Sequence, residues 1–183
     1  MKTKVLDLYC GLGGWAQAFP SSEYEITGYD IIDFSKEYPG KFIQSDILKS
    51  QKFPKCEILI ASPPCTEFSK TTFPTSWQSV RKNPPDTKTA TKLFNRVFQV
   101  AKQTKPKYYI IENVRGAEKY MGKARTHIGS RYFWGNFPLF TSRGEDIYGK
   151  YKLAPSKDRP ALRSKIPLSI ALAFESALHQ GKL

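Results

Sequence analysis

The chain of 183 residues is poor in the side chains that build disulfide frameworks and metal sites. It has three cysteines, two histidines and no CxxC pair, so we expect neither a disulfide scaffold nor a metal site. Free cysteines suit a reducing compartment, which favours the cytoplasm. No apolar run reaches about 18 residues, which argues against a membrane-spanning helix. The N-terminus also lacks the long apolar core of a signal peptide.

Acidic residues are scarce beyond the first third of the chain. Residues 1–62 carry seven Lys/Arg and eight Asp/Glu, whereas residues 81–107 carry eight basic residues and one acidic residue. Residues 115–165 carry twelve basic and four acidic residues, and the whole chain has a formal net charge of +13. This one-sided excess indicates a polyanionic partner. Nucleic acid is favoured over a membrane, because no basic amphipathic helix with a Trp/Leu face stands out.

Short apolar runs that read as strands alternate with helical segments and turns. A helix of about twenty residues is expected from Asp86 or Thr87 to Pro106, and an apolar helix is expected from Pro167 to Gln180. The alternation predicts an α/β fold with a doubly wound, mostly parallel sheet. The clearest predicted strands are residues 4–9, 24–29, 41–44, 56–61, 108–114 and 131–134.

The most informative stretch is Ser62-Pro63-Pro64-Cys65, which follows the apolar strand at 56–61. Two prolines end that strand and stiffen the turn after it, so the Cys65 thiol lies at the carboxyl end of a strand. Ligands bind at that edge of open α/β sheets, which makes Cys65 a candidate nucleophile. The alternative is a buried cysteine that fills space as a small apolar side chain.

A glycine-rich turn, Cys10-Gly11-Leu12-Gly13-Gly14, follows the first predicted strand. Glycine is needed where the backbone approaches a ligand or takes positive φ, although a tight connection between strand and helix would explain it as well. Asp30 ends the second strand about twenty residues later, the spacing of a carboxylate that binds ribose hydroxyls. A cap on the strand end is an equal alternative for Asp30. Asp46 follows the third strand in the same way.

Glu112 and Asn113 end the apolar run at 108–111. A glutamate is rarely buried unless it is paired, so Glu112 at the exit of such a strand needs a partner. The alternative is an exposed strand end.

Five short motifs occur in an order and with a spacing that resemble the C5-cytosine DNA methyltransferases. Each motif alone is weak, but a Pro-Cys and a Glu-Asn-Val triplet at this distance behind a matching glycine turn form a strong joint signal. The resemblance runs from about residue 4 to 114, with weaker similarity at Gly129–Phe133 and Arg163–Leu178. The five motifs are Asp7–Gly14, Gly28–Ile31, Ser45–Ile47, Ser62–Cys65 and Ile111–Val114.

The resemblance implies the Rossmann-like fold of S-adenosylmethionine-dependent methyltransferases, with S-adenosyl-L-methionine as cofactor. It implies that Cys65 adds to C6 of cytosine, that Glu112 holds the N3 and amino edge of the ring, and that Arg131 holds the base. A base in a duplex would have to be flipped out. The residues implied for the cofactor are Tyr9, Cys10, Gly11, Gly13, Gly14, Trp15, Asp30, Ile31, Asp46, Ile47 and Pro63. The residues expected to contact nucleic acid are Thr66, Ser69, Arg81, Lys82 and Arg115.

The chain departs from the family pattern around the substrate. Thr66 replaces the usual Gln after Pro-Cys. If Arg131 is the last arginine of the family's Gln-x-Arg-x-Arg pattern, His127 and Gly129 occupy the two earlier positions. Only about thirty residues separate Trp134 from the closing segment, too few for a target-recognition domain with its own core. Binding through phosphates, a separate specificity subunit or a single-stranded substrate would each fit this departure.

We therefore expect one catalytic methyltransferase domain over residues 1–183. Its expected parts are a cofactor half (1–62), a catalytic half (63–135), a short remnant in place of a target-recognition region (136–162) and a closing helix (163–183). The leading hypothesis is a cytoplasmic DNA (cytosine-5-)-methyltransferase of a bacterium or phage. The alternatives are the same chemistry on RNA and an inactive homologue that binds nucleic acid or cofactor. The sequence separates neither DNA from RNA nor single from double strands.

Overall fold

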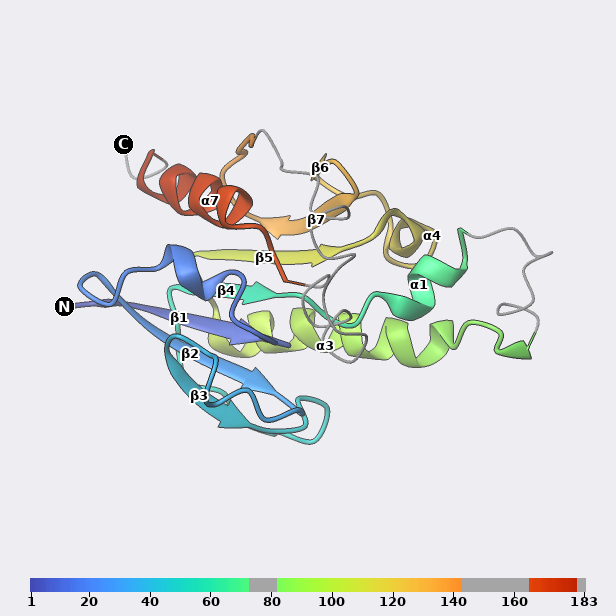
Figure 1. Ribbon diagram of the computed structural model, residues 1–183, viewed down its shortest axis with the longest axis horizontal. Helices are drawn as coiled ribbons and strands as arrows, with labels where there is room; N and C mark the ends of the chain where they lie inside the picture. The colour runs from blue at the N-terminus through green and yellow to red at the C-terminus, as the bar shows by residue number, and fades with distance from the viewer. Residues whose placement is uncertain (73–81, 143–164, 181–183) are drawn as a thin grey trace.

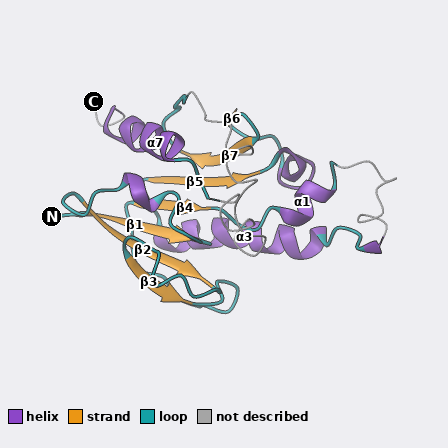
Figure 2. Ribbon diagram, viewed as in Figure 1, coloured by secondary structure: helices purple, strands orange, loops and turns teal. Residues whose placement is uncertain are grey.

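Seven strands form one sheet in the computed structural model, which describes residues 1–72, 82–142 and 165–180 (Figures 1 and 2). The strand order is β3-β2-β1-β4-β5-β7-β6; β1 to β5 pair in parallel, and β7 is antiparallel to β5 and β6. The predicted doubly wound, mostly parallel sheet is confirmed. The strands are β1 (Thr3–Leu8), β2 (Tyr24–Asp30), β3 (Lys41–Gln44), β4 (Ile58–Ala61), β5 (Tyr108–Asn113), β6 (Thr126–Ile128) and β7 (Arg131–Asn136).

Helices cover both faces of this sheet. On one face lie α7 and a 3-10 turn, η1, and on the other lie the long helix α3 and the short helices α1 and α4. The described helices and 3-10 turns are η1 (Ala16–Ala18), α1 (Thr66–Lys70), α3 (Thr87–Thr104), η2 (Arg115–Ala117), α4 (Glu118–Met121) and α7 (Leu168–Gln180). Among the residues described, no helix is long and apolar enough to span a membrane.

The alternation of side chains along the central strands divides the core into two clusters. Ile60 and Ile110 face the cluster that includes α7, whereas Leu59 and Ile111 face the cluster that includes α3. All four side chains are fully buried. Because both faces are covered, the strands read as continuous apolar runs, as expected for a parallel sheet.

Helix α3 begins and ends close to the predicted residues. The side chain of Asp86 accepts a hydrogen bond from the Thr89 amide at 3.0 Å, and Lys105 takes a left-handed conformation just before Pro106. One side chain of α3 also fixes the loop that follows β3. Arg96 donates to the carbonyls of Ile47 and Ser50, at 3.1 and 2.6 Å. The helix therefore positions the loop that contains Asp46.

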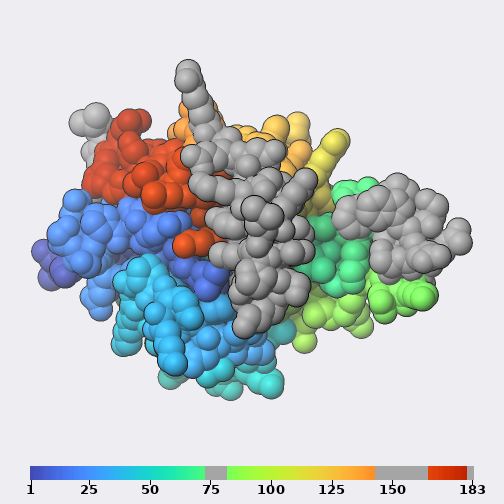
Figure 3. All heavy atoms as spheres, in the orientation of Figure 1, coloured from blue at the N-terminus to red at the C-terminus, as the bar shows by residue number. Residues whose placement is uncertain are grey.

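The closing helix packs against the N-terminal part of the chain. The predicted helix begins one residue later than expected, at Leu168, and the carbonyl of the preceding Pro167 accepts the amides of Ile170 and Ala171. Figure 3 shows the red closing helix against the blue N-terminal part of the chain, and α7 contacts η1. Most of the remnant expected at 136–162 lies outside the described residues.

Phe174 is the side chain of α7 on which this packing most depends. It is fully buried and its ring lies 5.4 Å from the Trp15 ring. We predict that Phe174→Ala lowers the free energy of unfolding by about 3–5 kcal/mol, because a large cavity is left. Leu172→Ala, on the same helix but 47% exposed, should cost less than about 1 kcal/mol. Urea denaturation followed by circular dichroism measures both, and equal losses would contradict this packing.

Candidate active site

Cys65 lies just beyond the carboxyl end of β4, directly before α1. The turn that positions it is held from two sides. The Asn113 side chain, at the end of β5, donates to the Pro63 carbonyl at 2.9 Å. The Ser69 hydroxyl donates to the Cys65 carbonyl at 3.0 Å, and the Ser69 amide donates to the same oxygen at 2.8 Å. Cys65 is therefore held at the carboxyl end of the strand, where the sequence predicts it.

Glu112 and Arg131 form a buried ion pair on the adjacent strands β5 and β7. Arg131 Nη1 donates to Glu112 Oε1 at 2.9 Å, and the glutamate is 6% exposed. The same guanidinium donates through Nη2 to the Lys165 carbonyl at 3.0 Å. The partner that the sequence demands for Glu112 is thus Arg131. Three segments far apart in the chain meet at this pair.

The Cys65 thiol lies within the field of this ion pair. Burial raises its pKa above the usual value for a thiol, and the negative charge of Glu112 raises the pKa further. The Ser69 hydroxyl and the positive charge of Arg131 act in the opposite direction. Burial also raises the pKa of Glu112, while Arg131 and Ser62 lower it. At neutral pH Cys65 is therefore protonated, and a reaction at its sulfur must include loss of that proton.

The glycine-rich turn after β1 has backbone conformations that favour glycine. Gly11 and Gly13 have φ values of 48° and 69°, and Tyr9 has a φ of 56°. A Cβ on Gly11 would meet nothing within 4 Å, so the turn is open at that position. The Gly11 amide donates to Asp30 Oδ2 at 3.0 Å, which joins the tips of β1 and β2.

Other residues implied for the cofactor are buried in the scaffold. A Cβ on Gly13 would meet Pro39 at 2.5 Å, and one on Gly14 would meet the Ile166 amide nitrogen at 2.4 Å. Trp15 is buried and its indole donates to the Ser62 hydroxyl at 3.0 Å. The buried residues of this predicted set are Cys10, Gly13, Gly14, Trp15, Ile47 and Pro63.

The remaining predicted cofactor residues lie at the tips of β1, β2 and β3. Asp30 Oδ1 accepts the Ile32 amide at 3.0 Å, so Asp30 caps its strand end while staying half-buried. Ile31 beside it is 63% exposed. Asp46 accepts the Leu48 amide at 3.0 Å and is also half-buried. The Tyr9 hydroxyl donates to the Leu93 carbonyl at 2.9 Å.

Four of the five residues predicted to contact nucleic acid belong to the described part of the chain. Thr66 and Ser69 belong to α1 beside Cys65; Thr66 is exposed and Ser69 is half-buried. Lys82 and Arg115 are exposed. Arg81 lies outside the described residues.

Sequence reasoning missed three contributors to the site. Ser62 bonds to Trp15 and interacts with Glu112, and Asn113 fixes the turn before Cys65. Ser62 belongs to the same motif as Cys65, and Asn113 belongs to the same motif as Glu112. Their place in these motifs is the sequence feature from which they could have been predicted. Lys165 contributes its backbone carbonyl to Arg131, for which no side-chain pattern exists.

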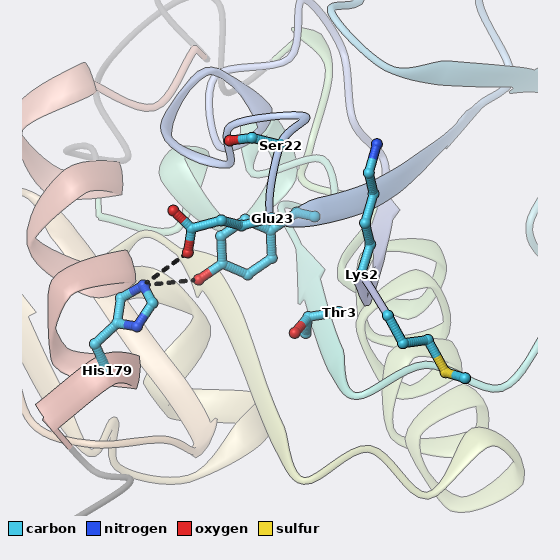
Figure 4. A pocket seen from close by; sticks show the side chains of 7 residues that line it. Lys2, Thr3, Ser22, Glu23 and His179 are labelled. Carbon is cyan, nitrogen blue, oxygen red and sulfur yellow. Dashed lines mark hydrogen bonds and ion pairs between the residues drawn. The ribbon is translucent and has the colours of Figure 1, made fainter.

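A separate hollow of about 400 Å³ lies at the other end of the strands, where β1 and β2 begin (Figure 4). There His179 lies 3.2 Å from the Tyr24 hydroxyl and 3.9 Å from a Glu23 carboxylate oxygen. Cys65 follows the far end of the parallel strand β4, so this hollow is not part of the candidate active site. In the described part of the chain, no cluster of three His, Cys, Asp or Glu side chains could hold a metal ion. The lining residues are Met1, Lys2, Thr3, Ser22, Glu23, Tyr24 and His179.

The sheet order and the single antiparallel strand between β5 and β6 define a Rossmann-like fold of the S-adenosylmethionine-dependent methyltransferase class. Residues 3–128 match the model of the C-5 cytosine-specific DNA methylase family. That match covers well over half of the chain, which therefore belongs to this family.

Relatives include bacterial and phage methyltransferases. The chain is 30% identical to the Type II methyltransferase M.FnuDI of Fusobacterium nucleatum in an alignment that covers 62% of this chain and 33% of that protein. It is 28% identical to the orphan methyltransferase M.Rho11sI of Bacillus phage rho11s, over 63% of this chain and 24% of that protein. The chain thus spans about a third or less of the length of these relatives. Among solved structures, the Entamoeba histolytica methyltransferase EhMeth is similar with a TM-score of 0.47 and 17% identity, over 79% of this chain and 55% of that one.

The opposing effects on the Cys65 pKa lead to a prediction about its reactivity with iodoacetamide, read peptide by peptide in a mass spectrometer. The thiolate is the reactive form, so alkylation should rise with pH with a midpoint above the ordinary thiol pKa of about 8.5. Glu112→Gln removes a negative charge and should lower the midpoint. Arg131→Gln removes a positive charge and should raise it. The buried Cys56 provides the internal control, and shifts of the same sign in both variants would contradict the assigned electrostatics.

Proposed function

We propose that this chain is the catalytic domain of a cytosine-C5 methyltransferase that acts on DNA and uses S-adenosyl-L-methionine. The observation that carries the proposal is the meeting of Cys65 with the buried Glu112–Arg131 pair at the carboxyl ends of adjacent strands. Membership of the C-5 cytosine-specific DNA methylase family supports the same conclusion. The proposed partner is DNA, duplex or single-stranded, with RNA as the substrate that the test must separate.

The proposed chemistry starts at Cys65. C5 of cytosine is too weak a nucleophile to accept a methyl group directly. Addition of the Cys65 thiolate to C6 forms an S–C6 bond and moves the electron pair of the C5–C6 double bond toward C5, which becomes nucleophilic. The raised pKa of Cys65 makes loss of the thiol proton a necessary first part of this step. A covalent Cys65–C6 intermediate is therefore part of the proposal.

Glu112 and Arg131 are proposed to hold the ring during this addition. A carboxylate has more acceptor positions than one arginine N–H uses, so Glu112 can hold the N3 and amino edge of cytosine while it stays paired. Addition of the thiolate pushes negative charge toward N3, so N3 must gain a proton to balance the one that the thiol loses, and the buried Glu112 carboxylate would stabilise the protonated N3. Arg131 keeps that carboxylate oriented and is itself held by the Lys165 carbonyl.

The tips of β1, β2 and β3 fit the proposed cofactor. Gly11 leaves the turn open, Asp30 offers a half-buried carboxylate for ribose hydroxyls, and Asp46 with Ile47 is proposed to contact the adenine. When bound, S-adenosylmethionine would supply a methyl group on a sulfonium centre. The buried residues Cys10, Gly13, Gly14, Trp15 and Pro63 would support this surface from behind.

The domain organisation is also a proposal, with residues 1–62 as the cofactor half and 63–135 as the catalytic half. A separate specificity subunit remains part of the proposal, because only about thirty residues separate Trp134 from the closing segment. The bacterial and phage relatives suit a cytoplasmic enzyme in such cells.

Methyl-labelled S-adenosylmethionine offered with duplex DNA, single-stranded DNA or RNA tests the proposal. We predict that the wild-type chain forms 5-methylcytosine and that Cys65→Ala lowers the rate at least about a thousandfold, because the nucleophile is lost. Cys56→Ala, at a buried cysteine outside the site, should keep the activity. Nucleosides from the digested substrates identify the methylated atom, and the best substrate identifies the nucleic acid. Methylation at another atom, or an active Cys65→Ala, would overturn the mechanism.

A further inference from the structure

A stacked pair of aromatic rings lies on the hairpin formed by β6 and β7. His127 and Tyr132 face each other across the two strands, and their rings are 4.9 Å apart and tilted by only 15°. His127 is exposed, whereas Tyr132 below it is half-buried. The strands are joined by a tight turn in which Gly129 has a φ of 58°. The imidazole therefore lies on the surface, supported by a second ring.

This pair lies close to the candidate active site along the sheet. Tyr132 is paired with Asn113, whose side chain fixes the turn before Cys65. The next residue toward the hairpin turn, Arg131, pairs with Glu112 through its guanidinium. The stack and the ion pair occupy successive positions of β7 and therefore lie on opposite faces of the same sheet edge. A nucleic acid that crosses this edge would reach both.

Positive charge gathers in the segment that surrounds the stack. Residues 114–132 include five Lys or Arg residues and one acidic residue, Glu118. The Glu118 carboxylate accepts the amide of Ala124 at 3.0 Å and so belongs to the local fold. Lys119 and Lys123 are exposed. Lys119 Nζ also lies 5.8 Å from the centre of the Tyr120 ring, which is 36% exposed.

The short helix α4 and the loop after it share a face of the sheet with the stack. Met121, Ala124 and Tyr132 pack against the same buried cluster. The Trp134 indole donates to the Gly122 carbonyl at 2.9 Å and so ties this loop to β7. The exposed lysines and the exposed imidazole are therefore carried by neighbouring elements on one face of the sheet. We call this set the hairpin surface: Lys119, Lys123, His127 and Tyr132.

Cross-strand packing alone could explain two facing rings, since such pairs stabilise hairpins. Stability alone, however, does not require an exposed imidazole in a segment so rich in cations. Aromatic faces combined with positive charge are the features by which proteins hold unpaired nucleotides.

We propose that the hairpin surface binds the single-stranded stretch that flanks the target base. An unpaired base would stack on the His127 ring, and Lys119 and Lys123 would contact the neighbouring phosphates. A base inside a duplex is already stacked on both sides, so this contact selects single-stranded or locally opened nucleic acid. This inference rests on the proposed function, because it names the form of substrate presented to the same site.

Binding of a fluorescein-labelled single-stranded oligonucleotide of about twelve nucleotides, without cofactor, provides the test, with its blunt duplex as comparison. We expect His127→Ala to weaken single-strand binding roughly tenfold and duplex binding less than about twofold. His127→Phe keeps an aromatic face and should restore binding. His127 is exposed, so circular dichroism should show both variants folded.

The phosphate contacts are tested by salt titration of the same oligonucleotide. Lys123→Ala should reduce the slope of log affinity against log salt concentration by about 0.7, the value for one phosphate of a single strand. Lys102→Ala is the matched control. It is an exposed lysine in the last turn of α3, which leads into the start of β5, whereas the stack lies beside the end of β5, so it should leave the slope unchanged.

The proposed role of the hairpin surface is refuted if the wild-type protein does not bind the single strand, or if the His127→Ala variant binds it as tightly as the wild type does. It is also refuted if His127→Phe behaves like His127→Ala, or if duplex and single-strand binding weaken equally. The methylation assay is read separately. If the protein methylates a substrate but His127→Ala leaves single-strand binding unchanged, this inference alone is overturned. If binding depends on His127 but no substrate is methylated, the proposed function alone is overturned.

Discussion

The buried ion pair between Glu112 and Arg131 is the constraint on which the rest of the site depends. A carboxylate that is only 6% exposed is costly to bury unless a cation and further hydrogen bonds compensate it. Arg131 supplies the cation from the neighbouring antiparallel strand, and Ser62 interacts from the turn after β4. The guanidinium in turn requires an acceptor, which is the Lys165 carbonyl. One buried charge thereby fixes β5, β7, the Cys65 turn and the closing segment relative to one another.

The same arrangement produces the properties of Cys65. A thiol at this position loses hydration and faces the charge of Glu112, and both effects keep it protonated. Arg131 is close enough to oppose them, so the ion pair acts on the thiol through both of its charges. The resting site is therefore a neutral thiol beside a compensated carboxylate. Any change in the charge of Glu112 or Arg131 would therefore alter the field at the sulfur.

The sequence predicts the parts of this site that depend on local rules. Apolar runs, proline turns and glycines place Cys65, Glu112 and Asp30 at strand ends, and the need of Glu112 for a partner follows from burial alone. Contacts between distant segments could not be predicted, because no local pattern encodes them. The sequence predicts Gly14 as part of a turn that binds the cofactor. The structure shows that a side chain at Gly14 would collide with the Ile166 backbone. Similarly, the sequence shows His127 only as a residue that differs from the family motif. Its stacking on Tyr132 follows from the pairing register of β6 and β7, which the sequence does not predict.

The contact between Gly14 and the closing segment also bears on how this site relates to a target-recognition region. β7 ends at Asn136, and Lys165 and Ile166 are again in contact with Arg131 and Gly14. Phe137 and Phe140 after β7 also pack in the core against Phe174, so the chain is fixed as far as Phe140 and again from Lys165. The entropic cost of closing a loop grows only slowly with its length, so a longer connection between these two fixed points would cost little folding free energy. The geometry of the proposed site would then not depend on the length of that connection, and under the proposal the nucleotides that flank the target would be bound by the sheet itself, at the edge formed by β6 and β7.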